Sequence, residues 1–295
     1  MNSVIDHIKE EDNKIIAKIR DFNLKHTFDC GQCFRWNEQE DGSYIGVAHG
    51  KVLHIYEDED TITFLNTNMT DFQNIWIDYF DFNRDYGAIK DKLTKDDNIM
   101  AQAVEHGCGI RILNQDEWET IISFIISARN FIPRIKKSVE LISEKYGRFI
   151  EEYNGKKYYA FPTPEELYNK PEEELKNLNV GYRAKYIQST TFIVKENQVD
   201  VYKLENLDRE MAKKNLLRLM GVGPKVADCI LLFSMRKYKA FPIDVWVKRV
   251  MEYFYFKDGA TNNQIQEFAK EKYEDLGGFA QQYMFYYARE LNIGK

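Results

Sequence analysis

The sequence predicts an α+β protein in which an N-terminal antiparallel sheet domain precedes a helical body. Two observations lead to this prediction. Between residues 33 and 65, short β-branched and aromatic segments alternate with turn-forming residues, whereas beyond residue 70 apolar side chains recur with a helical period. The chain has 295 residues, of which 44% are hydrophobic, so it can bury a large core and form two or three domains.

Three strands are expected in the first part of the chain. Segments 44–49, 52–56 and 61–65 are rich in β-branched and aromatic residues. The dipeptide His49-Gly50 separates the first two segments, and the acidic run 57–60 separates the last two. We interpret this acidic run as a solvated turn.

The helices of the second part follow from apolar periodicity. Ile135, Val139 and Ile142 fall at i, i+4 and i+7, which places them on one helical face. Trp118 and Ile121 do the same one helix earlier, behind an acidic first turn that suits the helix dipole. Further helices are predicted at residues 183–196, 208–219, 225–236, 244–254, 263–274 and 278–290.

We place the boundary between the two parts at residues 105 and 106. Residues 1–105 are expected to form the strand-rich domain, and residues 106–295 the helical part. The helical part is expected to have two helical subdomains and a helical hairpin at residues 208–236. No internal repeat or low-complexity tract interrupts the chain.

Composition excludes several classes of protein. No apolar run approaches the roughly 18–20 residues of a membrane span, and the N-terminal segment lacks the basic and apolar regions of a signal peptide. Four cysteines do not make a disulfide framework, so we expect a reducing cytoplasm. All five histidines lie within the first 106 residues, which excludes a His-based triad or an HExxH zinc site from the larger part.

The pair Cys30 and Cys33 forms a CxxC motif, but no second pair of ligands accompanies it. Cys108 and Cys229 stand at unrelated spacings, and no cysteine follows Cys229. A zinc site or a four-cysteine iron–sulfur cluster therefore lacks its ligands. We expect no metal and no other cofactor.

Charge is distributed unevenly along the chain. The net charge of −6 combines −10 over residues 1–106 with +4 over residues 107–295. Within residues 211–250, nine lysines and arginines are accompanied by only Asp228 and Asp244, a local charge of +7. An acidic total therefore does not exclude a nucleic-acid partner, and we expect weak, salt-sensitive binding to intact DNA.

The most informative segment is LMGVGPKVAD at residues 219–228, which joins two predicted helices through a short turn. Gly221 and Gly223, on either side of Val222, permit positive φ angles and close backbone approach, and Pro224 suits the first turn of a helix. Backbone N–H groups at such a helix N-terminus favour an anion such as a phosphate. A tight helix–helix connection alone would explain the glycines, but the neighbouring lysines and arginines favour a clamp on the DNA backbone.

This segment, followed by FPID at residues 241–244, resembles the helix–hairpin–helix and Gly/Pro…Asp signature of the HhH-GPD superfamily of DNA glycosylases. Three further stretches resemble 8-oxoguanine DNA glycosylases in particular, namely GQCFRW at 31–36, GYRA at 181–184 and FAQ at 279–281. The motifs keep their order from about residue 20 to residue 290. The resemblance implies a TBP-like N-terminal sheet domain and an all-helical glycosylase body.

Two residues of these motifs suit the chemistry of base removal. An amine must be partly unprotonated to attack the sugar C1′, and a helix N-terminus and burial both disfavour its charged form, which describes Lys225. Removing a base builds positive charge on the deoxyribose, which a carboxylate such as Asp244 can stabilise. Taken alone, Lys225 also suits a phosphate contact and Asp244 an ordinary helix N-cap, a role that is compatible with catalysis.

The resemblance implies roles for the other motif residues. Lys225 would displace the damaged base, form a Schiff base with C1′ and support β-elimination 3′ to the lesion. The base must first leave the stack, and it would then be sandwiched by Phe285 and Cys229. Gln281 would bond its Watson–Crick edge, and the Gly31 carbonyl would accept its N7–H. The DNA-binding residues that the resemblance implies are Gly221, Val222, Gly223, Arg129, Asn130, Arg134, Tyr182 (as a wedge in the vacated space), Arg183 and Trp246.

Two positions depart from the family pattern. Trp246 follows Asp244 by two residues, where family members commonly carry His, which alters local phosphate and water contacts. Residues 127–131 (SARNF) cover the Asn-rich run with which relatives read the cytosine opposite the lesion, and only Asn130 remains between Arg129 and Phe131. We therefore expect a weaker preference for cytosine opposite the lesion.

The resemblance thus implies an 8-oxoguanine DNA glycosylase with lyase activity. We expect a monomer that acts on double-stranded DNA containing 8-oxoguanine, in the cytoplasm or nucleoid and without a membrane partner. Two alternatives stay open. One is a glycosylase for another lesion, such as an alkylated base, although those relatives commonly lack the nucleophilic lysine. The other is a non-catalytic helix–hairpin–helix DNA-binding module, in which Asp244, Gln281 and Gly31 would be structural.

Overall fold

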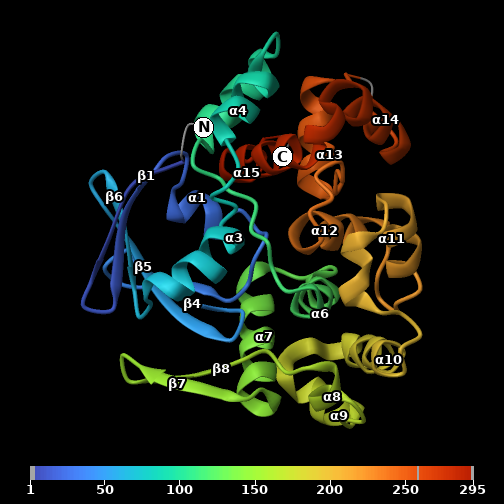
Figure 1. The fold of residues 1–295 in the computed structure, drawn as a ribbon. Helices are drawn as coiled ribbons and strands as arrows, with labels where there is room; N and C mark the ends of the chain where they lie inside the picture. Colours follow the sequence, from blue (N-terminus) through green and yellow to red (C-terminus); the bar gives the residue numbers. More distant parts are fainter. Residues whose placement is uncertain (1–3, 258, 294–295) are drawn as a thin grey trace.

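The computed structural model describes residues 4–257 and 259–293, which form a sheet domain beside a helical body (Figure 1). In this range the N-terminal sheet has six antiparallel strands in the order β1-β2-β6-β5-β4-β3. The strands are β1 (Ile5–Glu11), β2 (Lys14–Ile19), β3 (Trp36–Glu38), β4 (Tyr44–Ala48), β5 (Lys51–Asp58) and β6 (Thr61–Leu65).

Two-residue turns connect β1 to β2, β4 to β5 and β5 to β6. At the β1–β2 turn, Asp12 and Asn13 have φ angles of 42° and 60°, and at the β4–β5 turn His49 and Gly50 have 48° and 70°. Left-handed φ at both central residues gives a turn whose twist matches that of the flanking strands. The sheet is therefore built from tight hairpins, as the His49-Gly50 signal indicates.

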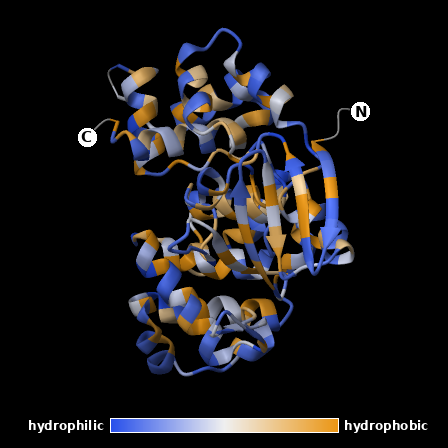
Figure 2. Cartoon of the chain, turned by 90° about the vertical axis from the view of Figure 1, so that its left-hand side faces the viewer, coloured by the Kyte–Doolittle hydropathy of each residue, from blue (hydrophilic) through white to orange (hydrophobic). Residues whose placement is uncertain are grey.

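The three predicted strands are present as β4, β5 and β6, and β1 to β3 are additional. β1 is an exposed edge strand whose charged residues hide the alternation of a half-buried strand, whereas Ile15, Ala17 and Ile19 of β2 do alternate into the core. Figure 2 shows hydrophilic and hydrophobic residues alternating along the strands. In the acidic run, Glu57 accepts a hydrogen bond from the backbone N–H of Leu24 at 2.6 Å, so this carboxylate also holds the start of helix α1 (Leu24–Phe28).

One face of the sheet packs on an aromatic core. Phe28 and Trp36 stack with ring centroids 4.2 Å apart, and Trp36 Nε1 donates to the Tyr79 hydroxyl at 2.8 Å. Trp36 directly follows segment 29–35, so the aromatic core anchors the C-terminal end of this segment. Short helical elements complete this part of the chain, namely α1, α2 (Met69–Asp71), η1 (Phe72–Trp76) and α3 (Ile77–Tyr79).

All six helices predicted from residue 183 onward are present, with ends that differ by at most three residues. A small hairpin, β7 (Phe149–Tyr153) with β8 (Lys156–Tyr159), is additional to the prediction. Within the described residues, no helix is both long and apolar enough to cross a lipid bilayer. The helical elements are α4 (Tyr86–Thr94), α5 (Asn98–His106), α6 (Glu117–Ser127), α7 (Ile132–Tyr146), α8 (Pro164–Leu167), α9 (Glu172–Leu175), η2 (Lys176–Val180), η3 (Gly181–Arg183), α10 (Ala184–Lys195), η4 (Val201–Asn206), α11 (Arg209–Leu216), α12 (Pro224–Ser234), α13 (Val245–Phe254), α14 (Asn262–Tyr273), η5 (Glu274–Leu276) and α15 (Gly277–Glu290).

The hydrophobic core of the helical body extends into the chain before residue 106. Tyr86 and Ile89 of α4 and Met100 of α5 belong to the same buried cluster as residues of α6, α12 and α15. In the reverse direction, Tyr158 of β8 packs in one cluster with Val47 of β4. We therefore propose that the chain divides near residue 85 rather than between residues 105 and 106, so that α4 and α5 belong to the helical part.

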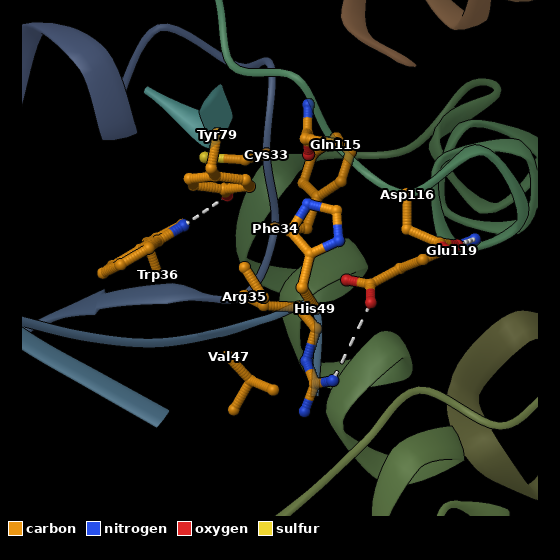
Figure 3. Close-up of a pocket in the computed structure, with 11 residues that line it drawn as sticks. Cys33, Phe34, Arg35, Trp36, Val47, His49, Tyr79, Gln115, Asp116 and Glu119 are labelled. Carbon is orange, nitrogen blue, oxygen red and sulfur yellow. Dashed lines mark hydrogen bonds and ion pairs between the residues drawn. The ribbon is translucent and has the colours of Figure 1, made fainter. Parts of the chain in front are cut away.

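A polar pocket lies where the sheet domain meets α6 (Figure 3). Arg35 is 5% exposed, its Nη1 lies 3.9 Å from Glu119 Oε2, and its Nη2 donates to the Tyr159 carbonyl at 2.7 Å. Among the described residues, its Nε and Nη1 find no hydrogen-bond partner. Arg35 therefore adds a charged contact to the apolar contacts, such as Phe34 with Phe124 of α6, that join the sheet domain to the helical part.

Glu119 makes this interface sensitive to pH. Burial raises the pKa of Glu119 to about 7, and the Arg35 guanidinium opposes this shift only in part. As pH rises from 4.5 to 7, the unfolded chain loses this proton while the folded chain keeps it, so the free energy of unfolding falls. We expect Glu119→Gln to gain about 2 kcal/mol of stability relative to the parent over this range, as measured by urea unfolding at both ends. A stability difference that does not change with pH would contradict this assignment.

Candidate active site

A helical hairpin presents the Gly-Val-Gly turn at the surface. Residues 217–223 join α11 to α12, and Gly221 has a φ of +90°. A Cβ on Gly221 would lie 3.0 Å from the Cβ of Tyr186, so both conformation and close packing require glycine. Val222 is buried, whereas Gly223 is exposed, and no described atom lies within 4 Å of a Cβ built on it. The turn is thus anchored at its centre and open to an anion at the start of α12.

Much of the positive charge near the hairpin is neutralised by carboxylates. Lys213 Nζ lies 2.7 Å from Oδ1 of the buried Asp228, and this ion pair joins α11 to α12. The local charge of +7 already includes Asp228, but carboxylates outside residues 211–250 reduce it further, so it overstates the charge that a DNA backbone would meet. The ion pairs with such carboxylates are Arg236–Asp78, Arg236–Glu205, Lys239–Asp275 and Lys248–Glu252.

Lys225 lies directly behind the turn, in the first turn of α12. Its Nζ lies 5.4 Å from the centroid of the Phe124 ring of α6. Burial raises the pKa of Cys229 to about 11 and also raises the pKa of Asp244, and the nearby Lys225 charge opposes both shifts. The structure therefore brings together an amine, a carboxylate and a protonated thiol, which the sequence places on two different helices.

Asp244 is the N-cap of α13, as predicted. Its Oδ1 accepts hydrogen bonds from the backbone N–H groups of Trp246 at 3.0 Å and Val247 at 2.8 Å. These two bonds fix the orientation of the carboxylate. The half-buried Trp246 ring lies 5.4 Å from the Arg249 guanidinium one turn later, and its contact with DNA stays a prediction.

Gly31 and Phe285 meet although they lie at opposite ends of the chain. Gly31 has a φ of +78°, and a Cβ on it would lie 3.0 Å from Phe285 Cε1. Two side chains of α15 hold this loop, because Gln282 Nε2 donates to the Cys30 carbonyl at 2.6 Å and Arg289 Nη2 donates to the Asp29 carbonyl. The Gly31 backbone is therefore held rigidly beside an aromatic ring.

Gln281 carries a buried acceptor that the protein does not use. The residue is 4% exposed, and among the described residues its Oε1 has no hydrogen-bond donor. Leaving such a group unpaired costs about 1–3 kcal/mol. A ligand that brings an N–H or N–H₂ donor would relieve this cost, which is what the Watson–Crick edge of a purine offers.

Two loops form a second surface near the lysine, and it includes the other predicted DNA contacts. Tyr182 is 49% exposed, and its hydroxyl lies 3.5 Å from the Ala128 carbonyl of the loop that follows α6. Arg129 and Arg134 are exposed on and after this loop. Tyr182, Arg129 and Arg134 are thus placed where a duplex could reach them, and their contacts with DNA stay predictions.

Arg183 and Asn130 both make hydrogen bonds to backbone carbonyls of the protein. Arg183 is 4% exposed and donates to the carbonyls of Ala128, Val180 and Arg129. Asn130 Nδ2 donates to the Ile126 carbonyl at 3.1 Å, and its Oδ1 accepts the N–H of Phe131. Both side chains thus bind backbone groups of the loops, and their contacts with DNA stay predictions.

Sequence reasoning missed three residues that shape the site. Phe124 supports the Lys225 ammonium, and Gln282 and Arg289 hold the Gly31 loop. Two adjacent glutamines within an apolar helix are an unusual pair, and this signal could have indicated Gln282. Phe124 and Arg289 offered no such signal, because a core aromatic and a surface arginine are ordinary helix residues.

Residues 14–121 match the family described as 8-oxoguanine DNA glycosylase, N-terminal domain, and residues 122–275 match the family described as HhH-GPD superfamily base excision DNA repair protein. The chain therefore belongs to the HhH-GPD superfamily of base excision DNA repair proteins. Its N-terminal match places it, more narrowly, among the 8-oxoguanine DNA glycosylases. The family predicted from the dispersed motifs is confirmed.

Known proteins resemble the chain over two thirds or more of its length. A Methanothermobacter thermautotrophicus protein named probable N-glycosylase/DNA lyase is 34% identical over 218 residues, which cover 67% of this chain and 69% of that protein. The structure of MBOgg1 in complex with a low-affinity DNA ligand is 49% identical, with a TM-score of 0.94 over 97% of this chain and 99% of that one. The structure of the Clostridium acetobutylicum 8-oxoguanine glycosylase/lyase, with double-stranded DNA containing cytosine opposite 8-oxoG, is 45% identical, with a TM-score of 0.95 over 98% and 100% of the two chains. The predicted fold class is thereby confirmed.

Proposed function

We propose that this chain removes 8-oxoguanine from double-stranded DNA and cuts the strand at the resulting abasic site. The family to which it belongs supports this activity. The single observation that carries the proposal is the juxtaposition of Lys225 with Asp244 and Cys229 directly behind an open Gly-Val-Gly turn. A turn that binds phosphate would bring the deoxyribose of the same nucleotide to the amine.

Lys225 is the proposed nucleophile. Its uncharged amine attacks the sugar C1′, the bond from C1′ to the base nitrogen N9 breaks, and the base leaves with the bonding electrons and takes up a proton. The amine then loses a proton as the sugar ring opens to a protonated Schiff base. Loss of a proton from C2′ breaks the C3′–O bond, which cuts the strand 3′ to the lesion. Asp244 stabilises the positive charge that develops on the sugar.

The pocket for the flipped base is proposed to lie between Cys229, Phe285, Gln281 and Gly31. The protonated thiol of Cys229 and the ring of Phe285 offer apolar faces for the two sides of a purine. The Gly31 carbonyl accepts the N7–H that 8-oxoguanine has and guanine lacks, so one backbone acceptor separates the lesion from the normal base. The unused Gln281 Oε1 accepts from the Watson–Crick edge.

Two neighbouring glutamines allow this pocket to be tested. We expect Gln281→Met to lower kcat/KM for 8-oxoguanine excision by about 10- to 100-fold, because the donor edge of the base loses its acceptor. The same variant should be at least as stable as the parent, since it removes a buried acceptor without a partner. The matched variant Gln282→Met should instead unfold more easily by about 1–3 kcal/mol, because it leaves the Cys30 carbonyl unpaired. Equal stability losses in both variants would contradict the assignment of Gln281 to the base.

The compartment is proposed to be the cytoplasm, or the nucleoid of a prokaryotic cell. All four cysteines are free in the structure, and Cys108 is exposed. An exposed free thiol suits a reducing compartment. Access to DNA in the same compartment then needs no export step.

Borohydride trapping on duplexes with single defined lesions tests the function. A covalent adduct with 8-oxoguanine DNA, absent with undamaged or alkylated DNA, is the expected result. A preformed abasic site serves as the control for the lyase step alone. An adduct that forms only with another lesion would favour a different glycosylase, and no adduct with any substrate would favour a non-catalytic DNA-binding module.

A further inference from the structure

Phe131 is an exposed aromatic residue that the proposed function leaves without a role. It is 63% exposed and precedes α7, next to the exposed Arg129 and three residues before the exposed Arg134. Exposing a phenylalanine ring is unfavourable in water, and basic and aromatic side chains side by side are typical of surfaces that stack on nucleic-acid bases. We call Phe131 and the half-exposed Tyr182 together the aromatic rim.

The backbone around Phe131 is held firmly. Its N–H donates to Asn130 Oδ1 at 3.1 Å, and its carbonyl accepts from the N–H groups of Arg134 at 3.0 Å and Ile135 at 3.1 Å. Asn130 in turn donates to Ile126, and Arg183 donates to the carbonyls of the same loop. A ring presented by an ordered loop costs little conformational entropy on binding.

The aromatic rim lies close to the reacting amine. Phe124 lies 5.4 Å from Lys225 Nζ, and Ala128 follows it by four residues, about 6 Å along the axis of α6. Ala128 also contacts the Tyr182 hydroxyl, so the loop of Phe131 and the loop of Tyr182 lie side by side. A damaged nucleotide that reaches Lys225 therefore lies close to the loops that carry both rings.

Flipping one base leaves its former partner without a pairing surface, and we propose that Phe131 stacks on this orphaned base. This inference rests on the proposed function. Tyr182 then occupies the gap in the damaged strand, so that Tyr182 contacts the damaged strand and Phe131 contacts the opposite strand. The contact is made by a ring face, which all four bases can meet.

Polar recognition of the orphaned base is correspondingly reduced. The Asn130 amide and the Arg183 guanidinium both bind carbonyls of the loops. Phe131 itself has no hydrogen-bonding side chain. Stacking on the aromatic rim would therefore discriminate little among bases opposite the lesion, in line with the weak preference expected from the sequence.

A binding cycle tests the stacking contact. The probes are duplexes with a stable abasic analogue in one strand and, opposite it, either thymine, its non-polar isostere difluorotoluene, or no base. For the parent, we expect removal of the opposite base to weaken binding by about 10-fold, within the range of one base–aromatic stack. The isostere should bind within about 3-fold of thymine, because it keeps the ring face and loses only the hydrogen bonds.

In Phe131→Ala, the penalty for removing the opposite base should fall below about 3-fold. The matched control is Tyr253→Ala on α13, which removes a ring of similar exposure, 65%, and should keep the full penalty. A variant that merely disturbs the fold would weaken all three duplexes alike and leave the penalty unchanged.

A penalty that is unchanged in Phe131→Ala would overturn the proposal. Binding of the isostere duplex more than about 10-fold weaker than that of the thymine duplex would also overturn it, because hydrogen bonds would then recognise the orphaned base. Borohydride trapping of the parent protein on 8-oxoguanine DNA tests the proposed enzyme activity independently of the stacking role of Phe131. An adduct with an unchanged penalty rejects only the role of Phe131.

Discussion

Replacing Lys225 by glutamine is expected to abolish covalent trapping and to lower base excision by at least about 10³-fold, because glutamine has no nucleophilic amine. The position of Lys225 behind an open turn, close to Asp244 and Cys229, makes it the only reasonable source of the adduct among the proposed catalytic residues. Single-turnover cleavage of an 8-oxoguanine duplex, with and without borohydride, measures both effects.

Two further variants distinguish a nucleophile from a phosphate contact. Lys225→Arg keeps the positive charge but cannot form the Schiff base, so it should be as inactive as the glutamine variant. Lys214→Gln removes an exposed charge from the same hairpin and should weaken DNA binding slightly while leaving trapping intact. Substantial strand cleavage by Lys225→Arg would show that the charge, rather than the amine, is what the reaction needs.

Replacing Asp244 by asparagine is expected to lower the rate of base excision by about 10²- to 10³-fold while the protein stays folded. Asparagine is as good an N-cap as aspartate, so the hydrogen bonds to Trp246 and Val247 persist. Burial raises the pKa of Asp244, with the two N–H donors and Lys225 opposing, so removing its charge should not destabilise the fold. The variant thus separates electrostatic stabilisation of the sugar from the structural role of the cap.

Single-turnover kinetics and thermal unfolding of the same preparation measure the two properties. Asp244→Ala is the matched comparison, because it removes both the charge and the cap, and it should lose about 1 kcal/mol of stability in addition to activity. If Asp244→Asn excised 8-oxoguanine at the parental rate, Asp244 would be a cap only.

The predicted helices are close to those observed because their periodicity is local. Helix α15 spans Gly277–Glu290 against a prediction of 278–290. The edge strand β1 could not be predicted in the same way, since its pairing with β2 depends on neighbours that a sequence window does not contain. Propensity describes such exposed strands poorly.

The candidate site shows the same division between local and tertiary information. The hairpin turn and the N-cap at Asp244 follow from short motifs, and both are present. The hydrogen bonds of Arg183 and Asn130 depend on carbonyl groups of loops that fold beside them, which no motif specifies. The same holds for Lys213 of α11, which forms an ion pair with Asp228 of α12.

The hydrogen bond from Gln282 to the Cys30 carbonyl spans 252 positions of the chain. During synthesis, the loop that carries Gly31, Lys225 and Asp244 all emerge before α15. The proposed base-recognition surface, which combines Gly31 with residues of α15, therefore forms after the proposed catalytic residues have been made. We expect truncation within α15 to remove the proposed selectivity for the damaged base.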